Sequence, residues 1–299
     1  MKRTKTNKEK AKVLAILTGD WHLRESQPVC RTDDFWETQW KKVKFISDLQ
    51  VFHDCPVICS GDLFHHWKPS PFLLSETMLR LPKQFSVIFG NHDLPQHNLD
   101  LGEKSGVWTL KAAGKLDILD GCHWGETPDP EKHSLYFPGI DKRMLVWHVM
   151  VWMKELPYPG CKDPDAYRLL RKHPEFDVIV TGHNHKPFVA QMDGRYLINP
   201  GSITRQEADQ NHRPAVVLFR EDMTFDPVFL PAPDSVITRE HLEDKKQRDE
   251  RLEAFISKLD GEWETTISFR DNLERFFGSN DIHPEVKKII YTGLDPIKT

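Results

Sequence analysis

Five short apolar runs, each followed by a polar cluster, constrain the fold of this chain more than any other feature of its sequence. The runs do not alternate with polar residues, a pattern that is typical of strands buried on both faces of a sheet. Most of the clusters contain glycine, which lets the backbone turn tightly where a strand ends. With their clusters, the runs read VLAILTGD, PVICSGD, FSVIFGNHD, MLVWH and FDVIVTGHNH.

Helical segments separate the first three of these runs. Residues 33–53 carry apolar side chains at helical spacing, and Thr32 or Asp33 can cap the start of this helix. Residues 71–81 predict a second, shorter helix. The order of strand, loop and helix predicts a layered α/β (α+β) domain. Such sheets place their functional sites at the carboxyl ends of the strands, where the polar clusters stand here.

The chain changes character over residues 188–230, where strand patterns follow one another with turn signals between them. An Asp-Gly pair at Asp193-Gly194 is typical of a hairpin, and residues 214–219 and 224–230 predict two more strands. We expect these segments to form an antiparallel sheet that completes the core. The sequence Pro-Ala-Pro at residues 231–233 then breaks the pattern.

This break divides the chain into a catalytic domain, residues 13–231, and a C-terminal appendage, residues 232–299. The appendage is predicted to be mainly helical, with helices over 238–259, near 272–277 and over 284–291. It is also acidic, because it holds 11 Lys and Arg against 15 Asp and Glu, whereas the first 231 residues hold 30 of each sign. Neither part is basic enough to indicate nucleic-acid binding by charge alone.

Composition and the ends of the chain restrict the class of protein further. Hydrophobic residues make up 38% and charged residues 29%, which is typical of a globular protein and argues against a membrane span. Residues 1–12 are basic and are expected to form a disordered arm, with contact to a polyanion as the alternative. The five cysteines include no Cys-x-x-Cys pair, so we expect neither disulfides nor a thiolate zinc site, and a cytoplasmic location.

The polar clusters share one chemistry, since they supply carboxylate, imidazole and amide side chains without thiolate. Such donors suit divalent metals such as Mn²⁺, Zn²⁺ or Fe²⁺. Each cluster taken singly is explained as well by ordinary polar residues, but an ordered series of five, each after a strand, is not. The candidate ligands are Asp20, His22, Asp62, Asn91, His148, His183 and His185.

Two metals about 3.5–4 Å apart need a shared ligand, and Asp62 is the natural bridging carboxylate. Such a pair activates water near neutral pH and holds the oxygens of a phosphoryl group. A proton donor is then needed at the leaving oxygen. His92 has the right chemistry, and the neighbouring Asp93 can hold its imidazole in one tautomer.

The ordered series resembles the calcineurin-like metallophosphoesterase superfamily over roughly residues 13–220. The resemblance implies a β-sandwich flanked by helices, with a dimetal site at the strand ends. It also implies His92 as the catalytic histidine and two sets of ligands. One metal would be held by Asp20, His22, Asp62 and His185, and the other by Asp62, Asn91, His148 and His183.

Two further segments are similar to SbcD-type DNA repair nucleases: residues 61–65, Gly-Asp-Leu-Phe-His, and residues 199–205, Asn-Pro-Gly-Ser-Ile-Thr-Arg. In that branch a histidine at the place of His65 lies beside the metals and orients the DNA strand. Ser202 and Arg205 would then contact substrate. Alternatively, His65 is an ordinary polar loop residue and Arg205 an exposed side chain without a role. Two tryptophans near the motifs, Trp21 and Trp67, either stack on unpaired bases or pack in the core.

The resemblance therefore predicts a metal-dependent DNA exonuclease and endonuclease of recombination or break repair, with two divalent ions. Mn²⁺ is the expected metal, and Mg²⁺, Zn²⁺ or Fe²⁺ are the alternatives. It further implies an SbcC-type, SMC-like ATPase partner and a homodimer. The appendage could dock onto that ATPase, or its apolar residues Leu252, Phe255, Phe276 and Phe277 could pack back on the core. The competing functions are a small-molecule phosphodiesterase or phosphatase, and a non-catalytic scaffold.

Overall fold

The computed structural model describes residues 11–208, 212–233, 236–240, 242–243, 246–251 and 269–294. The chain divides into two compact units, Met1–Thr238 and Arg239–Thr299. Most of the predicted basic arm and much of the predicted helix over 238–259 lie outside the described residues, as do Leu252 and Phe255.

The first sheet has six strands in the order β11-β10-β1-β2-β3-β4. Strands β1 to β4 run parallel to one another, β10 runs antiparallel to β1, and β11 runs antiparallel to β10. The parallel strands place their carboxyl ends at one edge. The bounds are β1 Val13–Thr18, β2 Val57–Cys59, β3 Phe85–Val87, β4 Asp117–Ile118, β10 Ala215–Arg220 and β11 Phe225–Phe229.

The second sheet has five strands in the order β5-β6-β7-β9-β8, with β6, β7 and β9 parallel. The single antiparallel sheet expected from residues 188–230 is wrong, because the hairpin β8–β9 joins this sheet whereas β10 and β11 join the first. An apolar pattern identifies a strand but not its partner. The bounds are β5 Leu135–Phe137, β6 Ile140–Trp147, β7 Val178–Thr181, β8 Phe188–Met192 and β9 Arg195–Asn199.

Four α-helices and two 3₁₀-helices accompany these sheets in the described part of the first unit: α1 Phe35–His53, α2 Pro71–Arg80, α3 Gly106–Ala112, α4 Ala166–Lys172, η1 Pro95–His97 and η2 Leu99–Lys104. The cap of α1 is Asp34, whose side chain accepts from the backbone N–H of Glu37, and not Thr32 or Asp33. Asp33 instead pairs with Arg31. No helix of the described residues is long and apolar enough to cross a membrane.

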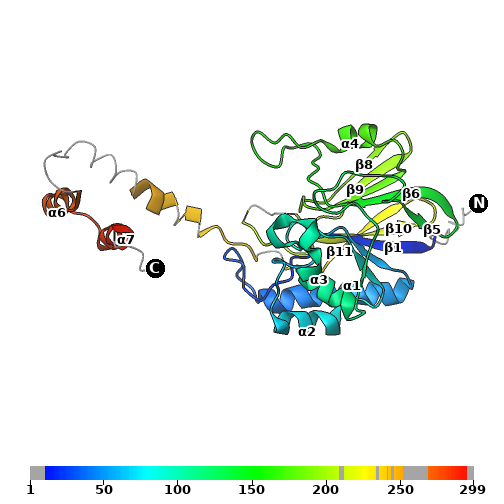
Figure 1. Ribbon diagram of the computed structural model, residues 1–299, viewed down its shortest axis with the longest axis horizontal. Coiled ribbons are helices and arrows are strands. Elements are labelled where there is room, and N and C mark those ends of the chain that lie inside the picture. Colours follow the sequence, from blue (N-terminus) through cyan, green and yellow to red (C-terminus); the bar gives the residue numbers. More distant parts are fainter. Residues whose placement is uncertain are drawn as a thin grey trace, which may run out of the picture. The chain divides into compact units, whose positions relative to one another are not determined.

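Three apolar clusters show that these elements form four layers (Figure 1). One lies between the first sheet and α1, α2 and α3, and includes Ile16 and Val43. The second lies between the two sheets and includes Leu17 and Val180. The third lies between the second sheet and α4, and includes Ile179. Because both faces of the central strands are buried, the layered α/β fold expected from their apolar runs is confirmed.

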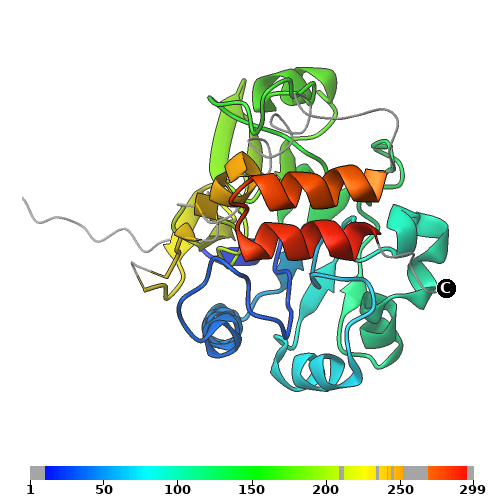
Figure 2. The same cartoon turned by 90° about the vertical axis from the view of Figure 1, so that its left-hand side faces the viewer.

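The described part of the second unit contains helices α6 Phe269–Ser279 and α7 Pro284–Leu294, which include two of the three predicted helical segments, those near 272–277 and over 284–291 (Figure 2). The two helices pack against each other. Phe276 and Phe277 form a small apolar cluster with side chains of α7, among them Val286 and Tyr291. This packing gives the pair of helices a core of its own.

Candidate metal centre

The carboxyl ends of strands from both sheets meet at Ser60, which directly follows β2. Its Oγ lies 3.2 Å from the carbonyl oxygen of Thr18 and 3.0 Å from that of Thr181, so it links β1 to β7. Its own carbonyl oxygen accepts a hydrogen bond from Nδ1 of His148 at 2.7 Å. The polar clusters that follow five strands of two sheets are thereby brought to one place.

The first group of candidate ligands comprises Asp20, His22 and His185, which offer ligand atoms within 4.8 Å of one another. The Nε2 atoms of the two histidines lie 3.1 Å apart. Oδ1 of Asp20 accepts from the backbone N–H of His183 at 2.9 Å. Oδ2 of Asp20 and Nδ1 of His22 are buried and have no hydrogen-bond partner among the described residues. The Asp20 oxygen, buried without a partner in a group of possible ligands, favours a bound ion here, whereas Nδ1 of His22 is the ring nitrogen that does not face His185.

The second group comprises Asp62, His148 and His183, again with ligand atoms within 4.8 Å of one another. Asn91 lies among them, because its Oδ1 is 3.1 Å from Nε2 of His148 and 2.9 Å from Nδ1 of His183. The Nδ1–H of His148 donates to Ser60, which leaves its Nε2 directed at these donors. An amide oxygen, a carboxylate and two imidazoles therefore converge.

Asp62 lies between the two groups. Its Oδ2 is 3.6 Å from Nε2 of His22 in the first group and 3.4 Å from Nε2 of His148 in the second. Its Oδ1 accepts a hydrogen bond from the backbone N–H of His92 at 2.8 Å. The carboxylate is thus the point that both groups share, as a bridging ligand must be.

Four candidate ligands have left-handed backbone conformations: Asp20 (φ 50°), His22 (φ 46°), Asp62 (φ 55°) and His183 (φ 74°). Such conformations cost of the order of 1–3 kcal/mol each for residues other than glycine and are typical of functional sites. Gly61 (φ 102°) precedes one of them, and a Cβ there would lie 2.5 Å from Nδ1 of His148. The close approach of the second strand end to this imidazole therefore requires glycine.

Burial keeps three of the histidines neutral. It lowers the pKa of His22 well below its usual value, and it lowers the pKa of both His183 and His185 to about 4. Neutral imidazole has the lone pair that a metal requires, so these side chains are in the metal-binding state at pH 7.

Asp20 and His148 hold protons more tightly than usual. Burial, reinforced by the charge of Asp62, raises the pKa of Asp20 to about 7. Burial alone would lower the pKa of His148, but the Asp62 carboxylate outweighs it and raises that pKa to about 9. A positive charge is thus retained where the ligand atoms converge. The buried partnerless oxygen of Asp20, the neutral imidazoles and this demand for positive charge together fit two divalent cations.

His65 and His92 lie beside the first group, and each forms a close set with His22. Nδ1 of His92 donates to the carbonyl oxygen of His65 at 2.8 Å, which fixes its tautomer and leaves Nε2 to exchange a proton. The pKa of His65 is lowered to about 4 by burial and by the cationic Arg24. Both imidazoles therefore lie beside the candidate ligands, and their catalytic roles stay a prediction.

Asp93 does not orient the imidazole of His92 as expected. Its carboxylate is fully buried and accepts hydrogen bonds from the backbone N–H groups of Asp62, Leu63, Phe64 and Gly90. The backbone turn directs it at the preceding loop, so the carbonyl of His65 holds the imidazole instead. Asp93 is a positioning residue for the loop that carries Asp62.

Ser202 and Arg205 form hydrogen bonds to other parts of the chain, and their expected contacts with substrate stay a prediction. The Ser202 hydroxyl donates to the carbonyl oxygen of Thr204 at 2.7 Å. Arg205 donates from Nη2 to the carbonyl oxygen of Pro233 at 3.1 Å. The Pro-Gly-Ser turn accounts for this, because it lies beside the first strand end, where Ser202 pairs with Gly19.

Other residues near the centre carried weak or misleading signals. Trp21 is fully buried and packs edge-on against Phe85, so the stacking role considered for it is wrong, whereas Trp67 is partly exposed. Trp124 was missed: its ring lies 4.9 Å from that of His183 and tilted by 33°. Ser60 was also missed, although it stands in the second cluster. A tryptophan in a loop without a motif offers no sequence signal.

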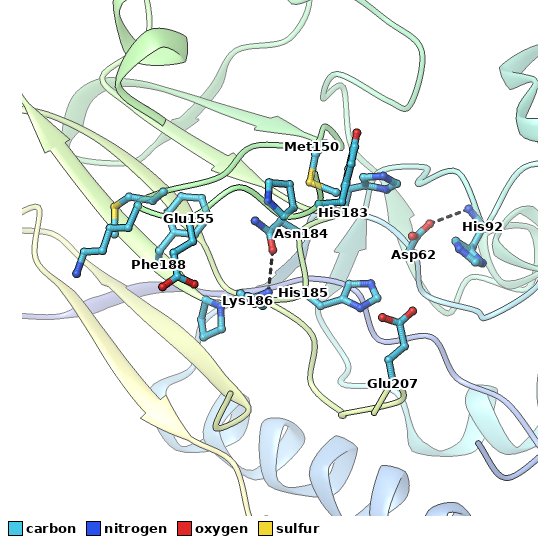
Figure 3. Close-up of a pocket in the computed structure, with 15 residues that line it drawn as sticks. Asp62, His92, Met150, Glu155, His183, Asn184, His185, Lys186, Phe188 and Glu207 are labelled. Atoms are coloured by element: carbon cyan, nitrogen blue, oxygen red, sulfur yellow. Dashed lines mark hydrogen bonds between the residues drawn. The ribbon is translucent and has the colours of Figure 1, made fainter. Parts of the chain in front are cut away.

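A cavity of about 530 Å³ opens beside this centre (Figure 3). Asp62 and His92 lie at one end of it, and His183 and His185 project from the loop after β7 along its side. The rest of the lining comes from Glu207, which lies beside His185 (Figure 3), and from Met150, residues 153–155, Pro157, Tyr158, Asn184 and residues 186–188. A volume of this size is typical of small-molecule and cofactor sites, so the centre can receive a substrate.

Comparison with known proteins adds sequence relationships to this geometry. The chain matches the calcineurin-like phosphoesterase superfamily domain over residues 19–222. The DNA double-strand break repair protein Mre11 of Haloferax volcanii is 26% identical over 211 residues, which cover 65% of this chain and 46% of that protein. The Mre11 protein of Archaeoglobus fulgidus is 26% identical, with coverages of 69% and 53%. The chain thus spans about half the length of these curated relatives.

Other similarities lie outside that group. A probable metallophosphoesterase of Methanocaldococcus jannaschii is 30% identical over 131 residues, which cover 44% of this chain and 64% of that protein. Among solved structures, a novel archaeal phosphodiesterase is 14% identical, with a TM-score of 0.44 and coverages of 72% and 99%. Vacuolar protein sorting 29 of Cryptosporidium parvum is 16% identical, with a TM-score of 0.36 and coverages of 73% and 97%.

Proposed function

The chain belongs to the calcineurin-like phosphoesterase superfamily, and from that membership we propose that it is a two-metal phosphodiesterase whose substrate is DNA. The proposed role is that of an exonuclease and endonuclease in DNA recombination or break repair. The proposal that the chain hydrolyses phosphoesters is based on the site. The proposal that its substrate is DNA is based on the relatives and on the residues around the site.

The position of Asp62 is the observation that carries the proposal. One carboxylate oxygen lies 3.6 Å from His22 of the first group and 3.4 Å from His148 of the second, so the chain presents two ligand sets with a shared member. Asp20 and His185 would complete the first set. The second would be completed by His183 and Asn91. Mn²⁺ is the proposed metal, and a bound pair supplies activated water and charge stabilisation for an in-line displacement at phosphorus.

The chain's own contribution to the reaction centres on His92. Its Nδ1 is engaged by the carbonyl of His65, so Nε2 is the atom that would give a proton to the leaving oxygen. The backbone N–H of His92 donates to Asp62, which fixes the imidazole relative to the shared carboxylate. His65, neutral and adjacent, is proposed to orient the strand on the leaving-group side.

Two observations support DNA as the substrate. Curated relatives that match 65% to 71% of the chain are named as DNA double-strand break repair proteins. His65 and Arg24 extend the site beyond the ligands, and the Arg24 guanidinium is held by the neutral partners Ser26 and Gln206, which leave its charge available to a phosphate. A small phosphodiester would not need this extension.

The partners are proposed on the same basis. An SMC-like ATPase subunit would bind the C-terminal unit, whose helices α6 and α7 have their own apolar core and leave Ile289 of α7 52% exposed. A homodimer is proposed for the catalytic unit. Both proposals would be tested by light scattering of the chain alone and after addition of the ATPase encoded by the same organism.

Hydrolysis with Mn²⁺ of single-stranded DNA, blunt duplex, circular DNA and an aryl phosphodiester tests the proposal. Wild type should cleave DNA, and Asp62→Asn should abolish cleavage of every substrate because it removes the shared negative charge. Asp100→Asn, at an exposed position, is the matched control and should retain full activity. Hydrolysis of the aryl diester with every DNA form left intact would overturn the nuclease assignment.

The second candidate is a nucleotide or other small-molecule phosphodiesterase. The bounded cavity of about 530 Å³ favours it, since that volume accommodates a substrate of nucleotide size. It requires the same metal centre and predicts activity on dinucleotides that does not increase with strand length. The substrate panel above distinguishes the two candidates.

A further inference from the structure

The cavity beside the metal centre extends past the candidate ligands, and part of its lining is apolar. The apolar part of the lining, called the apolar wall here, includes Met150, Met153, Tyr158 and Phe188. Met150 lies beside His183, and Phe188 lies at the end away from Asp62 (Figure 3). We propose that this wall binds the base of an unpaired nucleotide adjacent to the phosphodiester that is cleaved. The inference rests on the proposed function only in placing a phosphodiester at the metal centre.

Part of the apolar wall has no role in the core of the protein. Met150 is partly buried yet packs in none of the apolar clusters of the described residues, and Tyr158 is 50% exposed. Met153 and Phe188, by contrast, pack partly against the third cluster and form the base of the wall. Apolar side chains that are not packed in a hydrophobic core and that border a reactive centre are suited to bind substrate.

The segment that carries Tyr158 is a closed loop, residues 152–165. Its ends are paired at Trp152 and Asp165, and the Trp152 Nε1–H donates to the carbonyl oxygen of Asp163 at 2.8 Å. The Tyr158 hydroxyl donates to the Asp163 carboxylate at 2.9 Å. The ring is therefore held at the cavity before any ligand binds, which reduces the entropy lost on binding.

The charges on the wall balance. Lys154 and Lys186 line the cavity together with Glu155 and Glu207, so the charged side chains of the lining other than the candidate ligands sum to zero. A second phosphate would favour an excess of cations, whereas a neutral heterocycle with donor and acceptor edges suits mixed polar groups on an apolar surface. The balanced charges and the apolar lining thus both favour the binding of a nucleobase.

The position of the cavity determines where along the strand the bound base would lie. Because Asp62 and His92 lie at one end, a phosphodiester held there places its attached nucleoside against the remaining wall. Every base has a flat face that can stack on an aromatic ring, and methionine adapts to different shapes. A paired base would have to leave its helix to enter, so the substrate would be a single strand or a frayed end.

Calorimetric titration of the full chain tests the inference without relying on cleavage. The ligand is the dinucleotide d(TpT), compared with analogues in which either base is replaced by an abasic residue. The protein is loaded with Mn²⁺ and carries His92→Ala to slow turnover. Removal of one particular base should weaken binding about tenfold, as expected for loss of one stacked base.

Substitutions in the apolar wall then test whether its side chains bind the base. Met150→Ala with Tyr158→Ala should weaken d(TpT) binding to the level of the abasic analogue and leave binding of that analogue unchanged. Tyr158→Phe keeps the ring but loses the hydrogen bond to Asp163, so it should weaken d(TpT) binding less than Tyr158→Ala does. Leu156→Ala is the matched control, because Leu156 is 51% exposed on the same loop and does not line the cavity.

Equal binding of d(TpT) and both abasic analogues would overturn the inference, as would an equal loss of affinity in Leu156→Ala. The outcome is separate from that of the nuclease assay. Base-dependent binding without DNA cleavage would leave the subsite standing and remove the nuclease assignment. DNA cleavage with base-independent binding would do the reverse.

Discussion

The Asp93 carboxylate accepts a hydrogen bond from the backbone N–H of Asp62 at 2.8 Å, across two different loops of the catalytic unit. The same oxygen accepts from Gly90 at 3.0 Å, and the other accepts from Phe64 at 3.2 Å. One buried side chain thus holds the loop after β2 against the loop after β3. The shared candidate ligand, Asp62, is thus positioned through its backbone by a residue that is not itself a candidate ligand.

Replacement of Asp93 by alanine should therefore damage both stability and metal binding. Several buried N–H groups would lose their acceptor, at about 1–3 kcal/mol for each group left unsatisfied, so a total loss of about 3 kcal/mol or more is expected. Denaturant unfolding and metal titration measure the two effects. Asp100→Ala, exposed nearby, should change neither. A stable Asp93→Ala protein with normal metal affinity would contradict this role.

Gly90→Ala should disable the centre by a steric route. A Cβ at this position would overlap Oδ1 of Asp62 and lie 2.5 Å from its backbone nitrogen, so the shared carboxylate must move. We expect at least a hundredfold loss of activity, in line with misplacement of a reacting group by about 1 Å. Gly278→Ala is the control, because a Cβ there meets nothing within 4 Å. Equal activity of the two variants would show that Asp62 has room to adjust.

Metal affinity should rise with pH between about pH 6 and pH 8. The pKa of Asp20 is raised to about 7 and that of His148 to about 9, and both must lose their protons to bind a metal. Protons compete below each pKa, so binding should release about two protons at pH 6 and about one at pH 8. Calorimetry in buffers of different ionisation enthalpy counts them. Affinity that falls as pH rises would contradict the assignment of these ligands.

Lys42 provides a stability test that is independent of the site. Its side chain is buried in α1, and burial, with the nearby charges of Arg31 and Arg205, lowers its pKa to about 7. The unfolded chain therefore binds more protons than the folded one between pH 7 and the usual lysine pKa, and the free energy of unfolding should rise with pH across that range.

Lys42→Met should remove this pH dependence and stabilise the protein at pH 7 by about 2–4 kcal/mol, because the cost of a buried ammonium disappears. Lys41→Met, at an exposed neighbouring position, should have little effect on either quantity. Thermal unfolding of wild type, Lys42→Met and Lys41→Met at pH 6, 7 and 9 measures both the stability and its dependence on pH. A less stable Lys42→Met protein would mean that the ammonium is compensated in the folded state.

The strands and most of the residues at the metal centre were predictable because their signals are local. Each apolar run identifies its own strand, and the cluster after Thr18 or Cys59 necessarily lies at that strand's end. Parallel strands then collect these ends at one edge. The clusters supplied the candidate donors, and the family resemblance supplied their division into two sets.

Partnerships between distant segments were not predictable in the same way. Nothing in residues 188–230 says that β8 and β9 extend one sheet while β10 and β11 extend the other. The carboxylate of Asp93 adjoins His92 in sequence, yet the turn directs it to Asp62. Ser202 likewise follows a recognisable turn, but its hydroxyl is used within that turn. Such roles depend on backbone directions that side-chain patterns do not specify.

The most direct test of the account is hydrolysis of bis(4-nitrophenyl) phosphate by metal-free protein as Mn²⁺ is added in measured equivalents. Asp62 lies between two ligand groups, so activity should rise until two ions per chain are bound and then level off. A plateau at one equivalent, or a folded protein that binds Mn²⁺ without hydrolysing the diester, would contradict a two-metal phosphodiesterase.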